Sequence, residues 1–210
     1  MKFLCVVAGI LVACACAFTQ TGSQTHAPSP KILAHDQHDG MAISADPYVE
    51  ESRAKDTFGK ANPLPLGILP LEVFIRNDTP QPIRVNLETV QLEFHLDSGR
   101  EQIDWLTPEQ VANFVAHPKG VAGPTTRRLP VPLPGHDSKT EKLVAILRPL
   151  ALDADLIPPK STVHGFLYFN LSRHMAIVPK GQLYVPDAVK VPTKEPLMFF
   201  EVHLDSAETP

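Results

Sequence analysis

One short stretch of the chain gathers residue types that bind metal ions. His35, Asp36, His38 and Asp39 lie within five consecutive positions. Imidazole nitrogen and carboxylate oxygen suit zinc, copper or nickel. Two histidines three residues apart on a coil, however, have no scaffold that fixes a tetrahedral arrangement. We therefore expect a solvated polar segment here, with no metal and no cofactor, and keep a metal site as the alternative.

The cysteines offer a different chemistry, because all three of them lie near the N-terminus, at Cys5, Cys14 and Cys16. Residues 11–14 read Leu-Val-Ala-Cys, which resembles the lipobox of bacterial lipoproteins, in which the cysteine thiol is acylated and becomes the mature N-terminus. Residues 15–17 read Ala-Cys-Ala, the small-x-small form that an ordinary signal peptidase accepts. We predict lipidation of Cys14, and cleavage after Ala17 is the alternative.

Residues 1–17 have the composition of a secretory signal peptide. Lys2 precedes an apolar run from Phe3 to about Ala13, and small residues follow. This run is shorter than the roughly 20 apolar residues that a spanning helix needs. The sequence therefore predicts an exported protein, anchored in the membrane by lipid and facing the periplasm or the cell surface, or otherwise secreted or periplasmic.

Motifs for catalysis are missing from the sequence. There is no GxSxG elbow, SxxK, glycine-rich phosphate loop or HExxH. No cysteine follows Ala17, which excludes thiol catalysis and cysteine-ligated zinc in the folded part. The acid pairs Glu50-Glu51 and Asp153/Asp155 have the chemistry for acid–base work, but paired carboxylates are common on solvated surfaces. We predict no catalytic residue and no enzymatic activity.

The composition excludes some classes of binding partner and some types of fold. The chain has 210 residues, 43% of them hydrophobic and 20% charged, which is ordinary for a globular protein. The net charge of −4 gives no footprint for nucleic acid. Its 22 prolines exclude a long helical bundle, because proline removes an amide donor and clashes with the preceding helical turn. The expected partner is an envelope protein or polymer.

Several short segments have the alternating pattern of β-strands. In residues 89–96, Val90, Leu92 and Phe94 point one way and polar residues the other, which indicates a half-buried antiparallel strand. Residues 161–170 are apolar on both faces, which predicts a central strand covered on both sides. The remaining strands are expected in residues 71–76, 83–87, 182–185 and 197–204.

Two helices are expected between these strands. Thr107 and Gln110 are placed to form a capping box, with proline at the first helical position between them. A second helix is predicted for residues 139–148, before Pro149. Trp105, just before the first helix, is expected to fill the core or a helix–sheet contact rather than to serve as a platform for a ligand.

The chain is expected to contain one folded domain, residues 41–210, behind a flexible tether of residues 18–40, which is polar and has no apolar period. Residues 129–134, in which every second residue is proline, should be extended. Asn77 and Asn170 each begin an N-x-Ser/Thr sequon, although at Asn77 the same residues are typical of a turn. The strand pattern, with two short helical insertions, predicts a mainly β fold: an antiparallel β-sandwich.

Three phrases carry a resemblance to a known group. Residues 67–78, residues 82–87 and residues 157–169 resemble exported immunoglobulin-like β-sandwich domains of a group of uncharacterised bacterial lipoproteins. The resemblance implies an immunoglobulin-like sandwich and an envelope location, and it carries no catalytic residues across. The expected function is a non-catalytic, lipid-anchored binding or structural module. The alternatives are a metal-binding or delivery protein using His35 and His38, and an exported hydrolase with a site assembled from distant residues.

Overall fold

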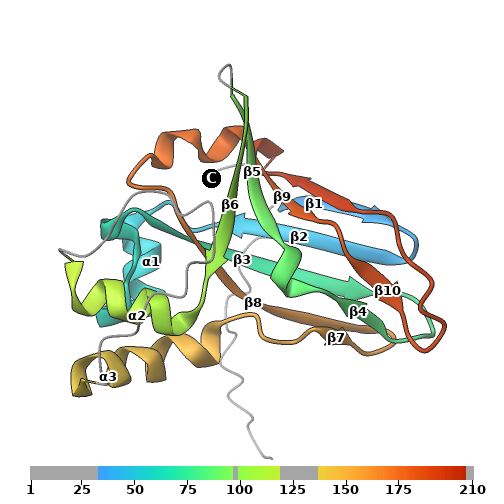
Figure 1. Ribbon diagram of the computed structural model, residues 1–210, viewed down its shortest axis with the longest axis horizontal. Helices are drawn as coiled ribbons and strands as arrows, with labels where there is room; N and C mark the ends of the chain where they lie inside the picture. The colour runs from blue at the N-terminus through green and yellow to red at the C-terminus, as the bar shows by residue number, and fades with distance from the viewer. Residues whose placement is uncertain (1–32, 97–98, 119–136, 207–210) are drawn as a thin grey trace, which may run out of the picture. The chain divides into compact units, whose positions relative to one another are not determined.

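The computed structural model describes residues 33–96, 99–118 and 137–206 (Figure 1). The predicted signal peptide, Cys14, most of the predicted tether and the proline-rich residues 129–134 lie outside these ranges. Most of the described chain forms antiparallel strands, which confirms the predicted mainly β class with short helical insertions; the immunoglobulin-like arrangement stays a prediction.

Eight strands form one sheet and three short strands form another. The order in the large sheet is β1-β2-β3-β8-β6-β5-β9-β11, and in the small sheet it is β10-β4-β7. The large sheet consists of β1 (Ala34–His38), β2 (Met41–Pro47), β3 (Ile68–Asn77), β8 (Ser161–Asn170), β6 (Gly99–Leu106), β5 (Gln91–Leu96), β9 (Gly181–Val185) and β11 (Phe200–His203). The small sheet consists of β10 (Ala188–Lys190), β4 (Ile83–Val85) and β7 (Leu156–Ile157).

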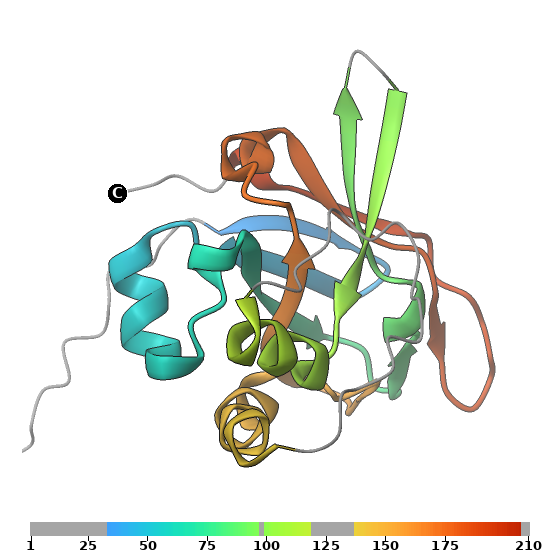
Figure 2. The ribbon, with the colours of Figure 1, turned by 60° about the vertical axis from the view of Figure 1, so that its left-hand side comes forward.

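The large sheet curves until its two edge strands meet. Although β1 and β11 stand at opposite ends of the strand order, the backbone N of Glu201 donates to Asp36 Oδ2 at 3.0 Å. The same two edges are seen side by side in Figure 1. The hairpin of β5 and β6 extends beyond the neighbouring strands (Figure 2). We call the contact between β1 and residues 198–201 the seam.

The central strand β8 separates two hydrophobic cores. Leu167 and Phe169 belong to the core inside the curved sheet, whereas Phe166 and Tyr168 belong to a second core under the helices. Both faces of its C-terminal part, residues 165–170, are therefore covered, as predicted, whereas Thr162 and His164 in its N-terminal part are exposed. Its neighbours are β3, over the whole length of the strand, and the end of β6.

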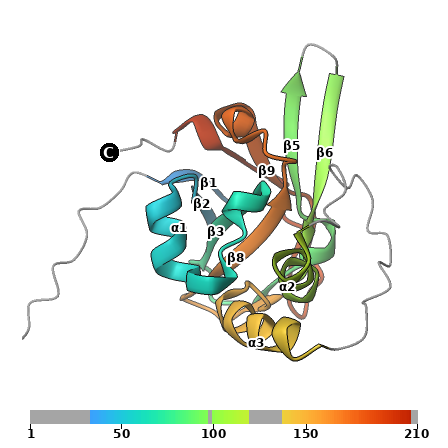
Figure 3. The same cartoon turned by 90° about the vertical axis from the view of Figure 1, so that its left-hand side faces the viewer.

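Three helices cover the outer face of the sheet around β8 (Figure 3). The helix α1 (Glu51–Phe58) follows β2, and α2 (Pro108–Ala116) and α3 (Ser138–Leu147) are the two helices that the sequence predicts. The capping box at α2 is confirmed: Thr107 accepts from the backbone N of Gln110, and the Gln110 side chain accepts from the backbone N of Thr107. Single 3₁₀ turns include η3 (Leu87–Thr89) and η5 (Arg148–Leu150).

The predicted boundary between tether and domain is wrong at its C-terminal end. Residues 34–38 form β1, which pairs with β2 along its whole length. Asp39 and Gly40 make the turn, with φ angles of 50° and 78°. Asp-Gly is a favoured pair for a two-residue hairpin turn in which both residues have positive φ. The Asp-Gly pair is therefore the feature of the sequence that indicates a hairpin, because the two strands lack an alternating apolar pattern.

Candidate functional site

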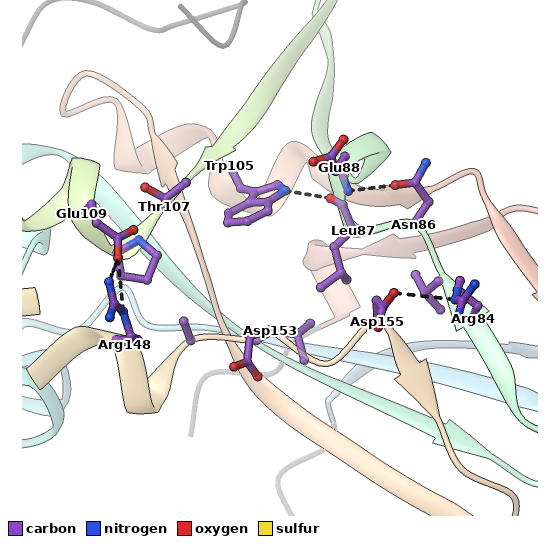
Figure 4. Close-up of a pocket in the computed structure, with 14 residues that line it drawn as sticks. Arg84, Asn86, Leu87, Glu88, Trp105, Thr107, Glu109, Arg148, Asp153 and Asp155 are labelled. Atoms are coloured by element: carbon purple, nitrogen blue, oxygen red, sulfur yellow. Dashed lines mark hydrogen bonds and ion pairs between the residues drawn. The ribbon is translucent and has the colours of Figure 1, made fainter. Parts of the chain in front are cut away.

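A cleft of about 830 Å³ opens where the small sheet meets the start of α2 (Figure 4). One wall is β4 with η3, the second is the end of β6 with the start of α2, and the third runs from η5 to the residue before β7. The lining residues are Arg84, Val85, Asn86, Leu87, Glu88, Trp105, Thr107, Pro108, Glu109, Arg148, Ala151, Leu152, Asp153 and Asp155. We call this the Trp105 cleft.

The centre of the cleft is apolar. Trp105 is partly buried and packs against the inner core, and its Nε1 donates to the carbonyl O of Leu87 at 2.7 Å. Its only polar atom therefore has a partner within the cleft wall. Leu87 and Leu152, both buried, add to the apolar lining. The prediction that Trp105 contacts the core is correct, but the same side chain also lines a cleft, which the sequence interpretation set aside.

Two ion pairs cross between the cleft walls. Arg148 Nη2 lies 2.5 Å from Glu109 Oε1, joining the end of α3 to the start of α2. Arg84 Nε lies 3.6 Å from Asp155 Oδ2, joining β4 to the residue before β7. Both ion pairs therefore tie the segment 148–155 to the facing walls. Arg84, Asp155 and Arg148 are exposed to solvent, whereas Glu109 is half-buried.

The electrostatics of Glu109 follow from these contacts. Burial by itself would raise the pKa of Glu109, but hydrogen bonds from Arg148 and from the start of α2 outweigh it and hold that pKa below its usual range. A carboxylate with a lowered pKa stays ionised near neutral pH. Glu109 is thus suited to hold Arg148 and unsuited to donate a proton as a general acid.

The segment 148–155 is also held in place by contacts with β8. The backbone N of Leu152 donates to the carbonyl O of Phe166 at 3.1 Å. A Cβ atom on Gly165 would lie 2.5 Å from the backbone N of Leu152, so the close approach requires glycine at this position. The third wall of the cleft is therefore a rigid part of the fold.

Charged residues of both signs line the cleft. Among the described lining residues, two are arginines, Arg84 and Arg148, and four are acidic, Glu88, Glu109, Asp153 and Asp155. Asp153 and Asp155 are the acid pair noted in the sequence, and the fold brings them to the cleft. The other acid pair, Glu50-Glu51, lies at the start of α1 and does not line it.

The His35–Asp39 cluster does not converge on one point. His35 and His38 are three apart on β1 and so point to opposite faces of the sheet. Asp36 and His38 face the same side as the core residues Ile43 and Met41, their cross-strand partners. Within residues 33–96, 99–118 and 137–206, no three or more His, Cys, Asp or Glu side chains are grouped so that they could hold a metal ion.

Instead, this cluster supplies the hydrogen bonds of the seam. Asp36 Oδ2 accepts from the backbone N of Glu201 at 3.0 Å, and Asp39 Oδ2 accepts from the backbone N of Met198 at 3.2 Å. His38 Nε2 donates to the carbonyl O of Phe199 at 3.1 Å. The His38 ring also stacks on Phe200, with centroids 3.8 Å apart. Side chains of β1 and of the turn that follows it thus bond to the backbone of β11 and of the two residues before it.

Of the other histidines, His164 gains a carboxylate partner that lies far away in sequence. Its Nδ1 lies 3.6 Å from Glu72 Oε1, and the Tyr48 hydroxyl donates to Glu72 Oε2 at 2.9 Å. Burial, followed by the bond to Glu72, raises the pKa of Tyr48. A hydroxyl that is harder to ionise is a poor nucleophile, and it contacts the carboxylate rather than the imidazole. This order differs from that of a catalytic triad.

Both sequon asparagines are buried. Asn77 is 0% exposed and Asn170 is 1% exposed, so neither side chain is open to a glycan in the folded protein. Asn77 Oδ1 accepts from the backbone N of Thr79 at 2.9 Å, which makes the turn that the sequence favours there. Asn170 Oδ1 accepts from the backbone N of Ser172 at 3.0 Å.

Comparison of the chain with protein-family models, with curated proteins and with solved structures gave no match. None of the helices in the described parts of the chain is long and apolar enough to cross a bilayer. The Trp105 cleft and the seam are therefore assessed from geometry and chemistry alone. The cleft is the better candidate for ligand binding, because the polar atoms of the seam are already bonded to the protein backbone.

Proposed function

We propose that this protein is a non-catalytic binding module of the bacterial cell envelope, exported and held at the membrane by lipid on Cys14. The Trp105 cleft is the binding site in this proposal. The single observation that carries it is the combination of an apolar centre around Trp105 with a polar and charged rim. Ligand sites in proteins have this composition, and their volumes run from about 300 to 1,000 Å³.

Three features favour binding over catalysis at this cleft. Both arginines are engaged by carboxylates of the cleft itself. The lowered pKa of Glu109 keeps an anion, whereas a general acid needs a raised value. The walls are tied together by ion pairs and by the contact with Gly165, which gives a preformed surface.

The envelope location rests on the leader and on the Leu-Val-Ala-Cys sequence at residues 11–14. Fractionation of cells that express the wild type or Cys14→Ser tests it. We expect the wild type in detergent-extracted membranes and Cys14→Ser in the soluble fraction, because acyl chains supply the anchor. Equal distribution of the two proteins would contradict lipidation and favour cleavage after Ala17.

The binding function is tested with the mature chain immobilised and exposed to envelope extract. We expect an envelope protein or polymer to be retained by the wild type and lost with Ala151→Trp, which fills the cleft from its third wall. Ile146→Ala changes an exposed residue of α3 that does not line the cleft, so this control should retain the component.

Two outcomes would contradict the proposal. Equal retention by Ala151→Trp and wild type would place the binding surface elsewhere. Turnover of generic ester, peptide or glycoside substrates by the wild type, reduced in Ala151→Trp, would favour the exported hydrolase. The arrangement of His35 and His38 on opposite faces gives no support to a metal-delivery protein.

A further inference from the structure

We infer that the outer face of strands β6, β5, β9 and β11 is a second binding site, which takes a neutral polysaccharide chain lying across the strands. This site is separate from the Trp105 cleft, so the inference goes beyond the proposed function. It is argued from rows of polar side chains on this face, from the aromatic residues beside them and from the spacing of the strands.

The strand register places polar side chains in two rows (Figure 1). Leu92, Leu183 and Val202 belong to the inner core, so the residues between them on their strands point outward. One row consists of Asp104, Gln91, Tyr184 and Glu201, and the next consists of Gln102, Glu93 and Gln182. We call these two rows the polar face.

Glu93 organises the second row. Its side chain is 0% exposed, and a buried carboxylate must be bonded to compensate for the water it has lost. It accepts from Gln102 Nε2 at 2.7 Å, from Gln182 Nε2 at 3.4 Å and from Arg100 Nη2 at 2.6 Å. These bonds fix the orientation of the surrounding side chains. Gln102 is exposed, and no hydrogen bond within the described part of the chain uses its amide oxygen.

The first row is held in the same way. Gln91 Nε2 donates to Asp104 Oδ1 at 2.9 Å, and Gln182 Nε2 donates to Glu201 Oε1 at 3.2 Å. Among the described residues, no hydrogen bond uses Gln91 Oε1, Asp104 Oδ2 or Glu201 Oε2. Each planar group therefore keeps one acceptor for a ligand while its other polar atom is bonded. Closely spaced acceptors of this kind suit a ligand with many hydroxyl donors, such as a sugar.

Exposed apolar side chains border the two rows. Phe199 is 47% exposed, and its ring centroid lies 5.8 Å from that of Tyr184. Met198, the preceding residue, is 58% exposed. Adjacent exposed apolar side chains with polar neighbours are typical of interaction sites. The C–H face of a sugar ring is apolar and can stack on an aromatic ring while the hydroxyl groups at its edge reach polar side chains.

The spacing of the strands favours a polysaccharide over other polymers. Neighbouring strands lie about 4.8 Å apart, which is close to the length of one hexose unit in an extended chain. Successive units can therefore lie over successive strands, with one unit at Phe199. An extended peptide binds a sheet through the backbone groups of its edge, whereas this surface is a face. Arg100 is paired with Glu93, and the carboxylates of Asp104 and Glu201 would repel an anionic polymer.

Affinity electrophoresis of the mature chain tests this inference. Native gels are cast without polysaccharide or with one of three neutral polysaccharides, hydroxyethyl cellulose, soluble starch or galactomannan. A gel with polygalacturonate is the anionic comparison. We expect at least one neutral polysaccharide to retard the wild type, to the same extent at low and high ionic strength, because uncharged hydroxyl groups are not screened by salt. Polygalacturonate should not retard it.

Variants locate the binding on the polar face. Phe199→Ala removes the stacking surface and should weaken the affinity by about threefold to tenfold. Gln102→Ala removes an exposed amide and should weaken it by about threefold. Glu101→Ala changes the neighbouring residue of β6, which points to the opposite face, and should leave the affinity unchanged. Because Phe199 and Gln102 are exposed, their variants should keep the urea midpoint of the wild type.

Several results would overturn the inference. One is that none of the three neutral polysaccharides retards the wild type, and another is that only polygalacturonate does so. Retardation that disappears at high ionic strength would mean binding by charge alone. Equal retardation of the wild type, Phe199→Ala and Gln102→Ala would place the site away from the polar face. Ala151→Trp should be retarded like the wild type, since a loss in this variant would assign the polysaccharide to the Trp105 cleft.

Discussion

The seam and the Trp105 cleft use similar residues in opposite ways. In the seam, Asp36, His38 and Asp39 are nearly consecutive, and their polar atoms bond to the backbone of residues 198–201. In the cleft, the charged residues come from separate segments between residues 84 and 155 and bond to one another. The first arrangement holds two strands together. The second surrounds an apolar surface that includes Leu87, Trp105 and Leu152.

The difference shows what determines whether polar residues can bind a ligand. Consecutive residues on a strand alternate between faces, so a compact motif such as His35–Asp39 is split by the pleat. Edge strands have unpaired backbone groups that such side chains can satisfy. Where several elements end together, as at the cleft, side chains from separate segments meet at their tips and line a shared concave surface.

The largest expected effect tests whether the seam is structural. Phe200 is 0% exposed and lies beneath the His38 ring, so Phe200→Ala should lower the free energy of unfolding by about 3–5 kcal/mol. Urea denaturation measures this. Phe199→Ala removes the neighbouring side chain, which is 47% exposed, and should change stability by no more than about 0.5 kcal/mol. Similar losses in the two variants would contradict the assignment.

A smaller effect tests the rigidity of the cleft. In Gly165→Ala the new Cβ meets the backbone of residues 151–152, so the free energy of unfolding should fall by about 1–3 kcal/mol. Because that backbone is a cleft wall, the Trp105 emission should shift as well. Thr162→Ala, at an exposed position of the same strand, is the control. Unchanged stability and emission in Gly165→Ala would mean that the wall moves freely.

The bond across the seam should contribute less. Asp36→Ala removes the acceptor of the Glu201 amide, which should cost about 1 kcal/mol and speed hydrogen exchange of that amide. Asp36→Asn keeps a carbonyl oxygen at this position and should recover part of the loss. If amide exchange at Glu201 is the same in Asp36→Ala as in the wild type, the seam does not depend on this side chain.

The smallest expected effect is a dependence on pH that both regions share. The bond from the backbone N of Met198, then that from His38, lowers the pKa of Asp39, and the pKa of Glu109 is lowered as described above. A folded-state pKa below the unfolded value gives stability that is present above about pH 4 and is lost as the pH falls through the folded-state pKa. Urea midpoints from about pH 5 to pH 2.5 measure this loss.

Variants divide this acid dependence between the two regions. Asp39→Asn should remove the contribution of the seam, and Glu109→Gln should remove that of the cleft, each making the fall in urea midpoint less steep. Asp56→Asn, which removes an exposed carboxyl from α1, should leave the slope as it is. If the fall of the urea midpoint with pH is as steep in both Asp39→Asn and Glu109→Gln as in the wild type, the contacts that lower the pKa of Asp39 and Glu109 do not contribute to stability.

Much of the fold could be predicted because local patterns and tertiary burial agree. The apolar faces of β8 follow from its sequence, and so does its central place in the sheet. The start of α2 follows from the capping box at Thr107. In these elements the side chains that specify the local structure are also the ones that are buried or bonded.

The edge strand and the cleft were not predictable in the same way. In β1 the inward-facing positions Asp36 and His38 are polar, because they bond to β11 rather than join the core, so the alternating apolar signal is missing. The cleft depends on contacts between residues far apart in sequence, such as Glu109 with Arg148. Trp105 gave the one local signal, yet whether a tryptophan is partly open or fully buried depends on the tertiary packing around it.

The seam also sets the order in which the structure can be completed. Asp36 and Glu201 are separated by 165 positions, so the curved sheet cannot close until residue 201 has been synthesised. Contacts of such long sequence separation slow folding, because a long loop must be ordered before they form. Until residues 200–203 are added, β1 and β9 carry free edges that can pair with other chains.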